Sequence, residues 1–338
     1  MTPSEKALEA AVPPGRAAAT GRRARGAAQA TSQYLGVLAV LGLLMVLLAV
    51  TQPQFLTAEN FVNIAETNVV LLLVATGMTF VLLTGGIDLS VGGMMGFSAI
   101  VCWQLLDVLP APVALLAAIG AALAMGLVTN GLLIGKAGLS FLVVTIGTGT
   151  LLHGLAQIWS GGQSQTIFEH AFLVKLGSQR IGGVPITVLI AVAVFVLAVL
   201  VLRYTGFGRM VYAVGGNPEA ARLAGINVGG VRIAVYTLCA ALAGIAGVVG
   251  AARLTSTSPD AGIGMELTAG AAVLLGGTSF MGGRGSLLGT LLGVLFLGVL
   301  QNGVTLAGIS PFWSNVVSGV VLVVAIGIDR LRSGKAMP

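Results

Sequence analysis

The sequence has few charged residues. Asp, Glu, Lys and Arg make up only 8% of the 338 residues, whereas 56% are hydrophobic, and a soluble domain contains about 25% charged residues. This composition excludes an ordinary soluble protein and indicates a chain that crosses a lipid bilayer several times. Basic residues exceed acidic ones by 17 to 11. In a membrane protein such an excess reports the orientation of the chain, so we expect no nucleic-acid partner.

Cysteine and histidine are also scarce, with two residues of each. Cys102 and Cys239 lie in separate apolar runs, which indicates neither a disulfide nor a metal site. His153 lies in an apolar run and His170 in a polar connection, so neither a zinc cluster nor a Ser-His pair is indicated. Residues 131–137, GLLIGKA, are one residue too short between the glycines for a phosphate loop and end on Ala where Ser or Thr would bind magnesium. We therefore expect no metal, no cofactor, no bound ATP and no catalytic site in this chain.

Long apolar runs account for most of the chain. A helix needs about 20 apolar residues to cross the hydrocarbon core, and helices satisfy their own backbone hydrogen bonds there. We predict an all-α polytopic membrane protein with about ten transmembrane helices, an even number that places both termini on one side. The predicted spans are residues 34–51, 61–83, 90–107, 112–134, 138–159, 185–203, 232–253, 266–281, 286–307 and 312–329.

The distribution of Lys and Arg predicts the orientation. In the ten-helix arrangement only Lys175, Arg180 and Arg253 lie opposite the termini, and the other 14 of the 17 basic residues lie on the same side as the termini. The positive-inside rule therefore places both termini in the cytoplasm. We predict three parts: a disordered basic cytoplasmic tail at residues 1–33, a transmembrane domain at residues 34–330 and a cytoplasmic tail at residues 331–338.

Two connections on the outer side are long, at residues 160–184 and 254–265. The first carries Glu169, His170, Lys175 and Arg180, and the second carries Asp260. These segments could dock an external partner or could be ordinary solvated connections, and the sequence leaves both interpretations open.

Glycine is abundant, with 50 residues. Small residues let membrane helices approach one another closely, and the spacing GG-x5-G-x3-G occurs at both residues 85–96 and residues 282–293. The shared spacing suggests an internal repeat, which many transporter folds contain. It does not distinguish a parallel repeat from an inverted one.

Polar groups inside apolar runs are costly and therefore informative. Asp88 stands in the string TGGIDLS, residues 84–90, where the glycines could break a helix and let the carboxylate face a cavity. Alternatively, Asp88 or Ser90 caps a helix that begins at Val91. The candidates for a helix break or a solute pathway are Gly85, Gly86, Asp88, Ser90, Asn130, Thr145 and Asn302. Further candidates for a polar lining are Asn68, Thr148, His153, Gln157 and Gln301. We expect most of these polar residues to form hydrogen bonds between helices.

A polar stretch at residues 203–232 separates two long apolar runs and carries four arginines. Its string Asn-Pro-Glu, residues 217–219, combines an N-cap, a proline suited to the first helical position and an acid suited to the first turn. Gly225 is a natural C-terminal stop. We therefore predict a short helix at residues 218–224.

The predicted short helix has a face of small side chains. Ala220, Ala221 and Ala224 form this face beside Arg222 and Leu223. Small faces permit close docking into a groove of a partner. An ordinary solvated helix is the alternative interpretation.

Three strings carry a family resemblance: TGGIDLSVGG at residues 84–93, AVGGNPEAARLAGINV at residues 213–228, and AVLLGGTSFMGGRGSLLGTLLGVLFLGVLQNG at residues 272–303. Together they resemble the membrane-spanning permease of ABC importers for monosaccharides, the ribose-type branch, and the resemblance covers residues 34–330. It implies a protein of the bacterial plasma membrane that pairs with a second permease copy, identical or different. It also implies two cytoplasmic ATPase subunits, an external sugar-binding protein, and a pathway between the two permease copies.

The resemblance also implies a role for the polar stretch. It makes residues 204–231 a cytoplasmic coupling segment in which residues 215–225 fit a groove of the ATPase. The coupling residues so implied are Gly215, Gly216, Asn217, Pro218, Glu219, Ala220, Ala221, Arg222 and Gly225.

Three alternatives remain beside a sugar importer. A permease of the branched-chain amino-acid importers shares the general architecture, although the string NPEAARLAGINV favours the sugar branch. A secondary transporter or channel that works without an ATPase is the second alternative. An intramembrane enzyme is the third, and the missing nucleophile-base pair argues against it. The sequence does not name the sugar.

Overall fold

The computed structural model describes residues 35–310 and, beyond them, residues 312, 313, 316, 319, 320, 323, 324 and 327. The predicted tails at residues 1–33 and 331–338 lie outside the described residues, as does most of the predicted span at residues 312–329. Within the described part the chain is mostly helical, with four strands of two residues each. This confirms the predicted helical fold class.

The apolar runs form helices that are joined by short connections. A first helix, Leu35–Thr51, precedes α3 (Ala58–Thr67), α4 (Val69–Leu83), α5 (Val91–Leu106), α6 (Ala111–Met125), the π-helix η1 (Gly126–Gly131), α7 (Leu132–Gly135), α8 (Phe141–Ser160), α9 (Ala171–Ser178), α10 (Ile186–Tyr204), α11 (Gly206–Gly216), α12 (Pro218–Leu223), α13 (Val228–Leu254), α14 (Met265–Leu275) and α15 (Leu287–Leu306). Strand β1 (Gln165–Thr166) pairs antiparallel with β4 (Ser256–Thr257), and β2 (Arg180–Ile181) pairs antiparallel with β3 (Val184–Pro185). The β1–β4 pair joins the two long connections at residues 160–184 and 254–265.

Several helices are long and apolar enough to cross a membrane. Among the described residues there are five, namely Ala111–Gly135, which unites α6, η1 and α7, together with α8, α10, α13 and α15. Helices α3 and α4, which bend by 48° about Asn68, make a sixth when taken together. Three shorter apolar helices are Leu35–Thr51, α5 and α14.

One predicted span is much shorter than expected. Residues 266–281 were expected to cross the membrane, but α14 ends at Leu275 and has 11 residues. At 1.5 Å per residue it reaches only about 16 Å, roughly half the thickness of the hydrocarbon core. Gly277, with a φ of 87°, turns the chain after this helix. Gly276 and Gly277 therefore end the helix, although the sequence stays apolar after them.

Helix α13 lies at the centre of the bundle. It is the most buried of the candidate spans and contacts α4, α5, α6 and η1. Its Gly and Ala residues let neighbours approach at backbone distance, since a Cβ on Gly247 would overlap the carbonyl oxygen of Met95 in α5.

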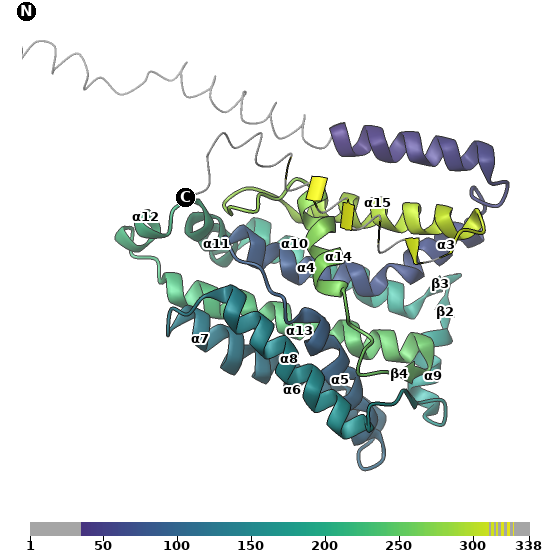
Figure 1. Cartoon of the computed structure of the whole chain (residues 1–338), viewed down its shortest axis with the longest axis horizontal. Helices are drawn as coiled ribbons and strands as arrows, with labels where there is room; N and C mark the ends of the chain where they lie inside the picture. The colour runs from purple at the N-terminus through teal and green to yellow at the C-terminus, as the bar shows by residue number, and fades with distance from the viewer. Residues whose placement is uncertain are drawn as a thin grey trace, which may run out of the picture.

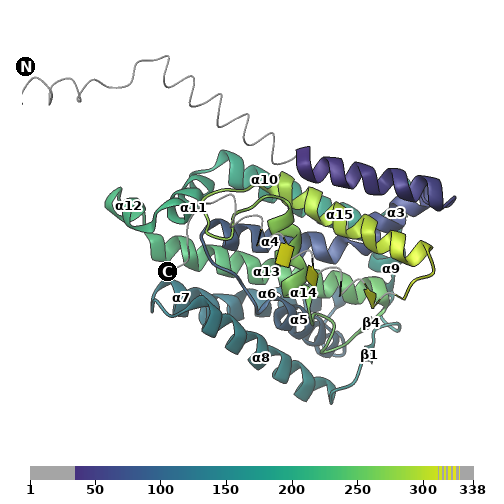
Figure 2. The same cartoon turned by 45° about the horizontal axis from the view of Figure 1, so that its top comes forward.

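The bundle has two distinct ends. In Figure 1, α7, α11 and α12 lie at the left end, and α9 and the β2–β3 pair lie at the right end. Figure 2 shows the same separation after a turn of the view, with β1, β4 and α9 at the right. We call these ends the α12 end and the strand end.

Three Gly-Gly pairs meet at the α12 end: residues 85–86 after α4, residues 215–216 at the end of α11, and residues 282–283 between α14 and α15. The amide of Gly283 donates to the carbonyl oxygen of Leu83 at 2.9 Å, and a Cβ on Gly215 would overlap that same oxygen. Gly282 has a φ of 85°, and a Cβ on it would lie 2.7 Å from the amide nitrogen of Gly85. Three distant segments therefore touch through their backbones.

These contacts predict opposite behaviour for two adjacent glycines. We expect Gly215→Ala to destabilise the protein, by about 1–3 kcal/mol, because the new methyl group would overlap the Leu83 carbonyl. Gly216→Ala is the matched control, since a Cβ there meets no atom within 4 Å. Thermal unfolding of each variant in detergent checks the prediction. Equal melting temperatures for the two variants would show that the backbone contact is unimportant.

Candidate functional site

The chain is not helical at residues 84–90, between α4 and α5, and this break lies inside the bundle. Gly85 has a φ of 79°, a left-handed conformation that ends α4. Asp88 in the break is fully buried. Its Oδ1 accepts hydrogen bonds from the backbone N–H of Ser90 at 2.9 Å and from the Ser90 hydroxyl at 2.6 Å. Ser90, rather than Asp88, is the N-cap residue of α5, and its side chain makes no capping hydrogen bond. Asp88 instead holds Ser90 in a local turn just before the helix.

Asn130 joins this break to a different helix. Its Nδ2 lies 3.2 Å from each carboxylate oxygen of Asp88 and donates to Ser90 Oγ at 2.8 Å. Asn130 lies on the π-helix η1, whose wider turn is an uncommon feature that is frequent at functional sites. Its own Oδ1 is buried and has no hydrogen-bond partner within the part of the chain that the structure describes.

A buried carboxylate is tolerated only when hydrogen bonds replace its water. Asp88 has three donor groups around it, from Ser90 and Asn130. The hydroxyl of Tyr236 on α13 also donates to the carbonyl oxygen of Ile87, at 3.3 Å. The structure thus brings Gly85, Asp88, Ser90 and Asn130 into one site, which we call the Asp88 network.

Two other candidates lie elsewhere. The hydroxyl of Thr145 donates to the Phe141 carbonyl within α8, at 2.8 Å. Asn302 of α15 exchanges two hydrogen bonds with Asn60 of α3, at 2.7 and 3.0 Å. The Asn302 pair is a contact between helices, as we expected for most polar residues in the spans.

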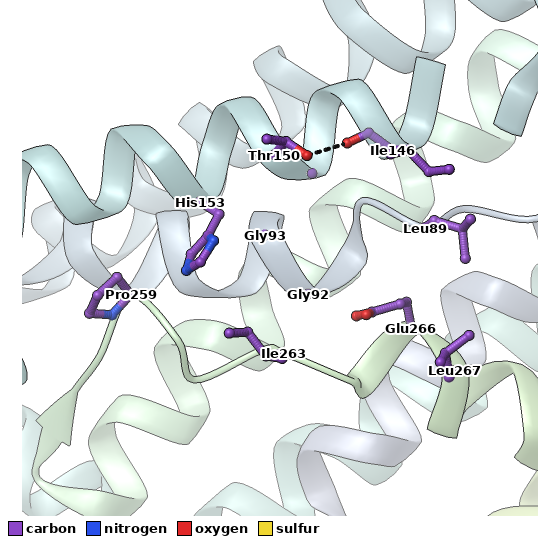
Figure 3. A pocket seen from close by; sticks show the side chains of 11 residues that line it. Leu89, Gly92, Gly93, Ile146, Thr150, His153, Pro259, Ile263, Glu266 and Leu267 are labelled. Atoms are coloured by element: carbon purple, nitrogen blue, oxygen red, sulfur yellow. Dashed lines mark hydrogen bonds between the residues drawn. The ribbon is translucent and has the colours of Figure 1, made fainter. Parts of the chain in front are cut away.

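A cavity of about 370 Å³ lies beside the Asp88 network. Its lining comes from the first turn of α5, from α8, from the connection before α14, and from the first turn of α14 (Figure 3). The lining residues are Leu89, Gly92, Gly93, Ile146, Gly149, Thr150, His153, Pro259, Ile263, Glu266 and Leu267. None of them is Lys or Arg.

Two polar side chains of the cavity carry its chemistry. His153, one of the predicted lining candidates, places Nε2 2.7 Å from Oδ1 of Asp260. Glu266 Oε1 accepts from the backbone N–H of Gly264 at 3.3 Å, and its carboxylate faces the cavity in Figure 3. Sequence reasoning did not single out Glu266, although a carboxylate at the start of a long apolar run was a usable signal.

The short helix of the polar stretch is confirmed at the α12 end. Asn217 Oδ1 accepts from the N–H of Ala220 at 3.0 Å, and Pro218 is the first helical residue. The helix ends at Leu223, and Gly225 follows with a φ of 82°. The N–H of Ile226 donates to the carbonyl of Ala221, and that of Gly225 to the carbonyl of Arg222, both at 3.0 Å. These two bonds form a Schellman motif.

The exposed face of α12 differs in one residue from the predicted small-residue face. Ala221 is buried in the hydrophobic core, because α12 rests on α11 and α13. Leu223 is 89% exposed, the highest value among the exposed large hydrophobic residues of the described part. Arg222 and Glu219, both exposed, form an ion pair at 3.1 Å. Ala221 therefore anchors α12, and the outward face carries the other residues.

The family model described as "Branched-chain amino acid transport system / permease component" matches residues 60–326. The ribose import permease protein RbsC of Escherichia coli (strain K12) is 40% identical over 296 residues, which cover 86% of this chain and 92% of that protein. RbsC of Bacillus subtilis (strain 168) is 39% identical over 306 residues, which cover 89% of this chain and 94% of that protein.

A more distant relative is the galactose/methyl galactoside import permease protein MglC of Haemophilus influenzae. It is 32% identical over 315 residues, which cover 88% of this chain and 94% of that protein. No solved structure matches the chain. The family match spans most of the bundle, including the Asp88 network, the cavity and α12. The chain therefore belongs to the family of permease components that is described for branched-chain amino acid transport systems.

Proposed function

We propose that the chain is the membrane-spanning permease subunit of an ABC importer that carries a monosaccharide across the bacterial plasma membrane. The observation that carries the proposal is the 40% identity to a ribose import permease over 92% of that protein's length. A galactose import permease is also similar over nearly its whole length. These relatives favour a sugar over a branched-chain amino acid, although the family description names the latter.

Its partners follow from this function. They are a second permease copy, two cytoplasmic ATPase subunits that hydrolyse ATP, and an external sugar-binding protein. The exposed α12 offers a docking element at one end of the bundle. At the other end the β1–β4 pair ties residues 160–184 to residues 254–265, which supports these segments as the surface for the binding protein.

The ten-helix topology with both termini in the cytoplasm is part of the proposal. Six spans are long enough to cross a membrane, and the shorter helices Leu35–Thr51 and α5 add two. The half-length α14, taken together with the non-helical connections on either side of it, and the run at residues 312–329 bring the number of crossings to ten. Positions 35–310 contain nine Lys and Arg residues, and only three of them lie at the strand end: Lys175 in α9, Arg180 in β2 and Arg253 in the last turn of α13. This asymmetry supports a cytoplasmic α12 end. The contact between Gly85 and Gly282 supports the internal repeat, since each begins one copy of the glycine spacing.

The site residues divide into two groups in this proposal. Gly215, Gly216, Asn217, Pro218, Glu219, Ala220, Arg222 and Gly225 shape or present the coupling helix, and Ala221 anchors it. Gly85, Gly86, Asp88, Ser90 and Asn130 hold the helix break. Asn302 stabilises the contact between α15 and α3, whereas Thr145 bonds within α8. ATP-driven closure of the ATPase subunits moves α12, and the Gly-Gly contacts pass that movement to α4 and to the connection between α14 and α15.

The exposed face of α12 predicts that coupling to the ATPase is lost when one of its outward side chains, Leu223 or Arg222, is replaced. We expect Leu223→Asp, and separately Arg222→Ala, to lower sugar uptake and sugar-stimulated ATPase activity about ten-fold or more, because buried anchor residues dominate interfaces. Val108→Asp is the control, since Val108 is 74% exposed and follows α5, away from α12. Uptake and ATPase assays on the reconstituted importer check this. Unchanged activity in both α12 variants would contradict the coupling role.

The Asp88 network predicts a difference between two substitutions. We expect Asp88→Ala to destabilise the protein by about 1–3 kcal/mol, because the donors on Ser90 and Asn130 lose their acceptor. Asp88→Asn retains an acceptor for Ser90, and a 180° flip of the Asn130 amide turns its unpartnered Oδ1 toward the new amide nitrogen as an acceptor, so most stability is kept. Melting temperatures in detergent measure both effects. A stable Asp88→Ala variant with impaired transport would instead favour a role in the pathway.

The orientation predicts which surface positions are reached from outside the cell. We expect a cysteine in place of Gln163 to react with a membrane-impermeant thiol reagent in intact cells. A cysteine in place of Ala224 should react only after permeabilisation, because both positions are exposed but lie at opposite ends. The native Cys102 and Cys239 are buried and give a low background. The reverse labelling pattern would overturn the proposed sidedness.

A further inference from the structure

The cavity beside the Asp88 network lies where two helices begin. Leu89, Gly92 and Gly93 border it at the start of α5, and Glu266 and Leu267 border it in the first turn of α14. Helix N-termini carry partial positive charge. The carboxylate of Glu266 compensates this charge from within the chain, so the cavity does not require an anionic solute.

Glu266 has one carboxylate oxygen free for a solute. Oε1 accepts from the Gly264 N–H at 3.3 Å, whereas Oε2 has no hydrogen-bond partner or ion pair within the described residues. Oε2 lies over the backbone of α5, since a Cβ on Gly92 would come within 2.5 Å of it. Glycine at this position therefore lets the carboxylate of Glu266 lie directly against the backbone of α5.

The other walls are also built from close backbone contacts. A Cβ on Gly93 would overlap the carbonyl oxygen of Gly149 in α8, and a Cβ on Gly262 would overlap that of Gly92. Three segments distant in sequence are thus held against one another around the cavity, with the Glu266 carboxylate and the His153 imidazole facing inward (Figure 3). A volume of about 370 Å³ falls in the range of about 300–1,000 Å³ that is usual for small-molecule sites.

We propose that Glu266 binds the hydroxyl groups of the solute in this cavity during its passage, and that it is a specificity-determining residue of the permease. This inference rests on the proposed function as a sugar importer. A carboxylate accepts hydrogen bonds from several hydroxyl groups, and bonds to a charged acceptor are stronger than neutral ones.

The same lining disfavours a phosphorylated sugar. Its phosphate would need a cationic partner to leave water. The cavity lining contains neither Lys nor Arg, and Glu266 would repel the phosphate. A neutral polyhydroxy solute therefore fits the cavity better than a sugar phosphate does.

The test uses the complete importer, with its ATPase and binding protein, in proteoliposomes. The probes are radiolabelled ribose and galactose, and the measured quantity is the amount of sugar moved for each ATP hydrolysed. We expect Glu266→Gln to lower uptake about ten-fold or more. Sugar-stimulated ATP hydrolysis and the melting temperature should stay near the wild-type values, so the ratio of sugar to ATP falls. A merely structural role would lower hydrolysis and uptake together.

Two further variants make the result decisive. Glu59→Gln removes an exposed carboxylate at the start of α3, remote from the cavity lining, and should leave uptake unchanged. Ile263→Trp narrows the cavity from a side chain that is 68% exposed, so it should block uptake without unfolding the protein.

The outcomes separate this inference from the proposed function. Wild-type uptake of ribose or galactose together with normal uptake in Glu266→Gln and Ile263→Trp would overturn the role of Glu266 while keeping the sugar importer. Wild-type importer that moves neither sugar, but accumulates radiolabelled leucine, would overturn both. A Glu266→Gln variant that hydrolyses ATP normally but moves little sugar would support the inference.

Discussion

Backbone N–H and C=O groups inside this bundle need hydrogen-bond partners from the protein, because water does not reach them. This requirement determines the structure of the bundle interior. Residues 84–90 leave the helical conformation within it, and such a break is stable only when protein groups replace the lost helical hydrogen bonds. Asp88 supplies the replacement by accepting from Ser90 and Asn130, and Tyr236 donates to the Ile87 carbonyl. Because α5 can then begin inside the bundle, its first turn becomes one wall of the cavity.

Backbone contacts between glycines give the same bundle its second constraint. At the α12 end, Gly215 and Gly282 lie against the backbone near Leu83 and Gly85, so the base of α12, the helix break and the connection after α14 share one contact region. Close backbone contacts of this kind resist gradual deformation, because the packed atoms have no space to move closer together. A displacement of α12 therefore has to move the neighbouring segments or separate them.

Sequence reasoning succeeded where the determinants were local. Asn217, Pro218 and Gly225 each act within a few residues, so the short helix and its ends could be predicted within one residue. The start of α5 after Ser90 was likewise predicted, but the expected side-chain cap is not formed by Asp88 or Ser90. The partner of Asp88 could not be predicted, because Asn130 lies 42 positions away on a π-helix that has no sequence signal. The short α14 and the cavity were missed because apolar composition alone does not show where a Gly-Gly pair turns the chain.

Helix α14 lies between the cavity beside the helix break and the glycine contacts at the α12 end. Its first turn places Glu266 at the cavity, and the connection that follows its last residue, Leu275, carries the Gly282 contact with the break. Hydrogen bonds along a helix keep its length fixed, and at about 16 Å α14 is too short to bend appreciably. A shift of the glycine contacts at the α12 end therefore changes the position of Glu266 relative to α5 and α8. A half-length helix at this position thus allows one end of the bundle to alter the cavity, whereas a full span would place Glu266 at the membrane surface.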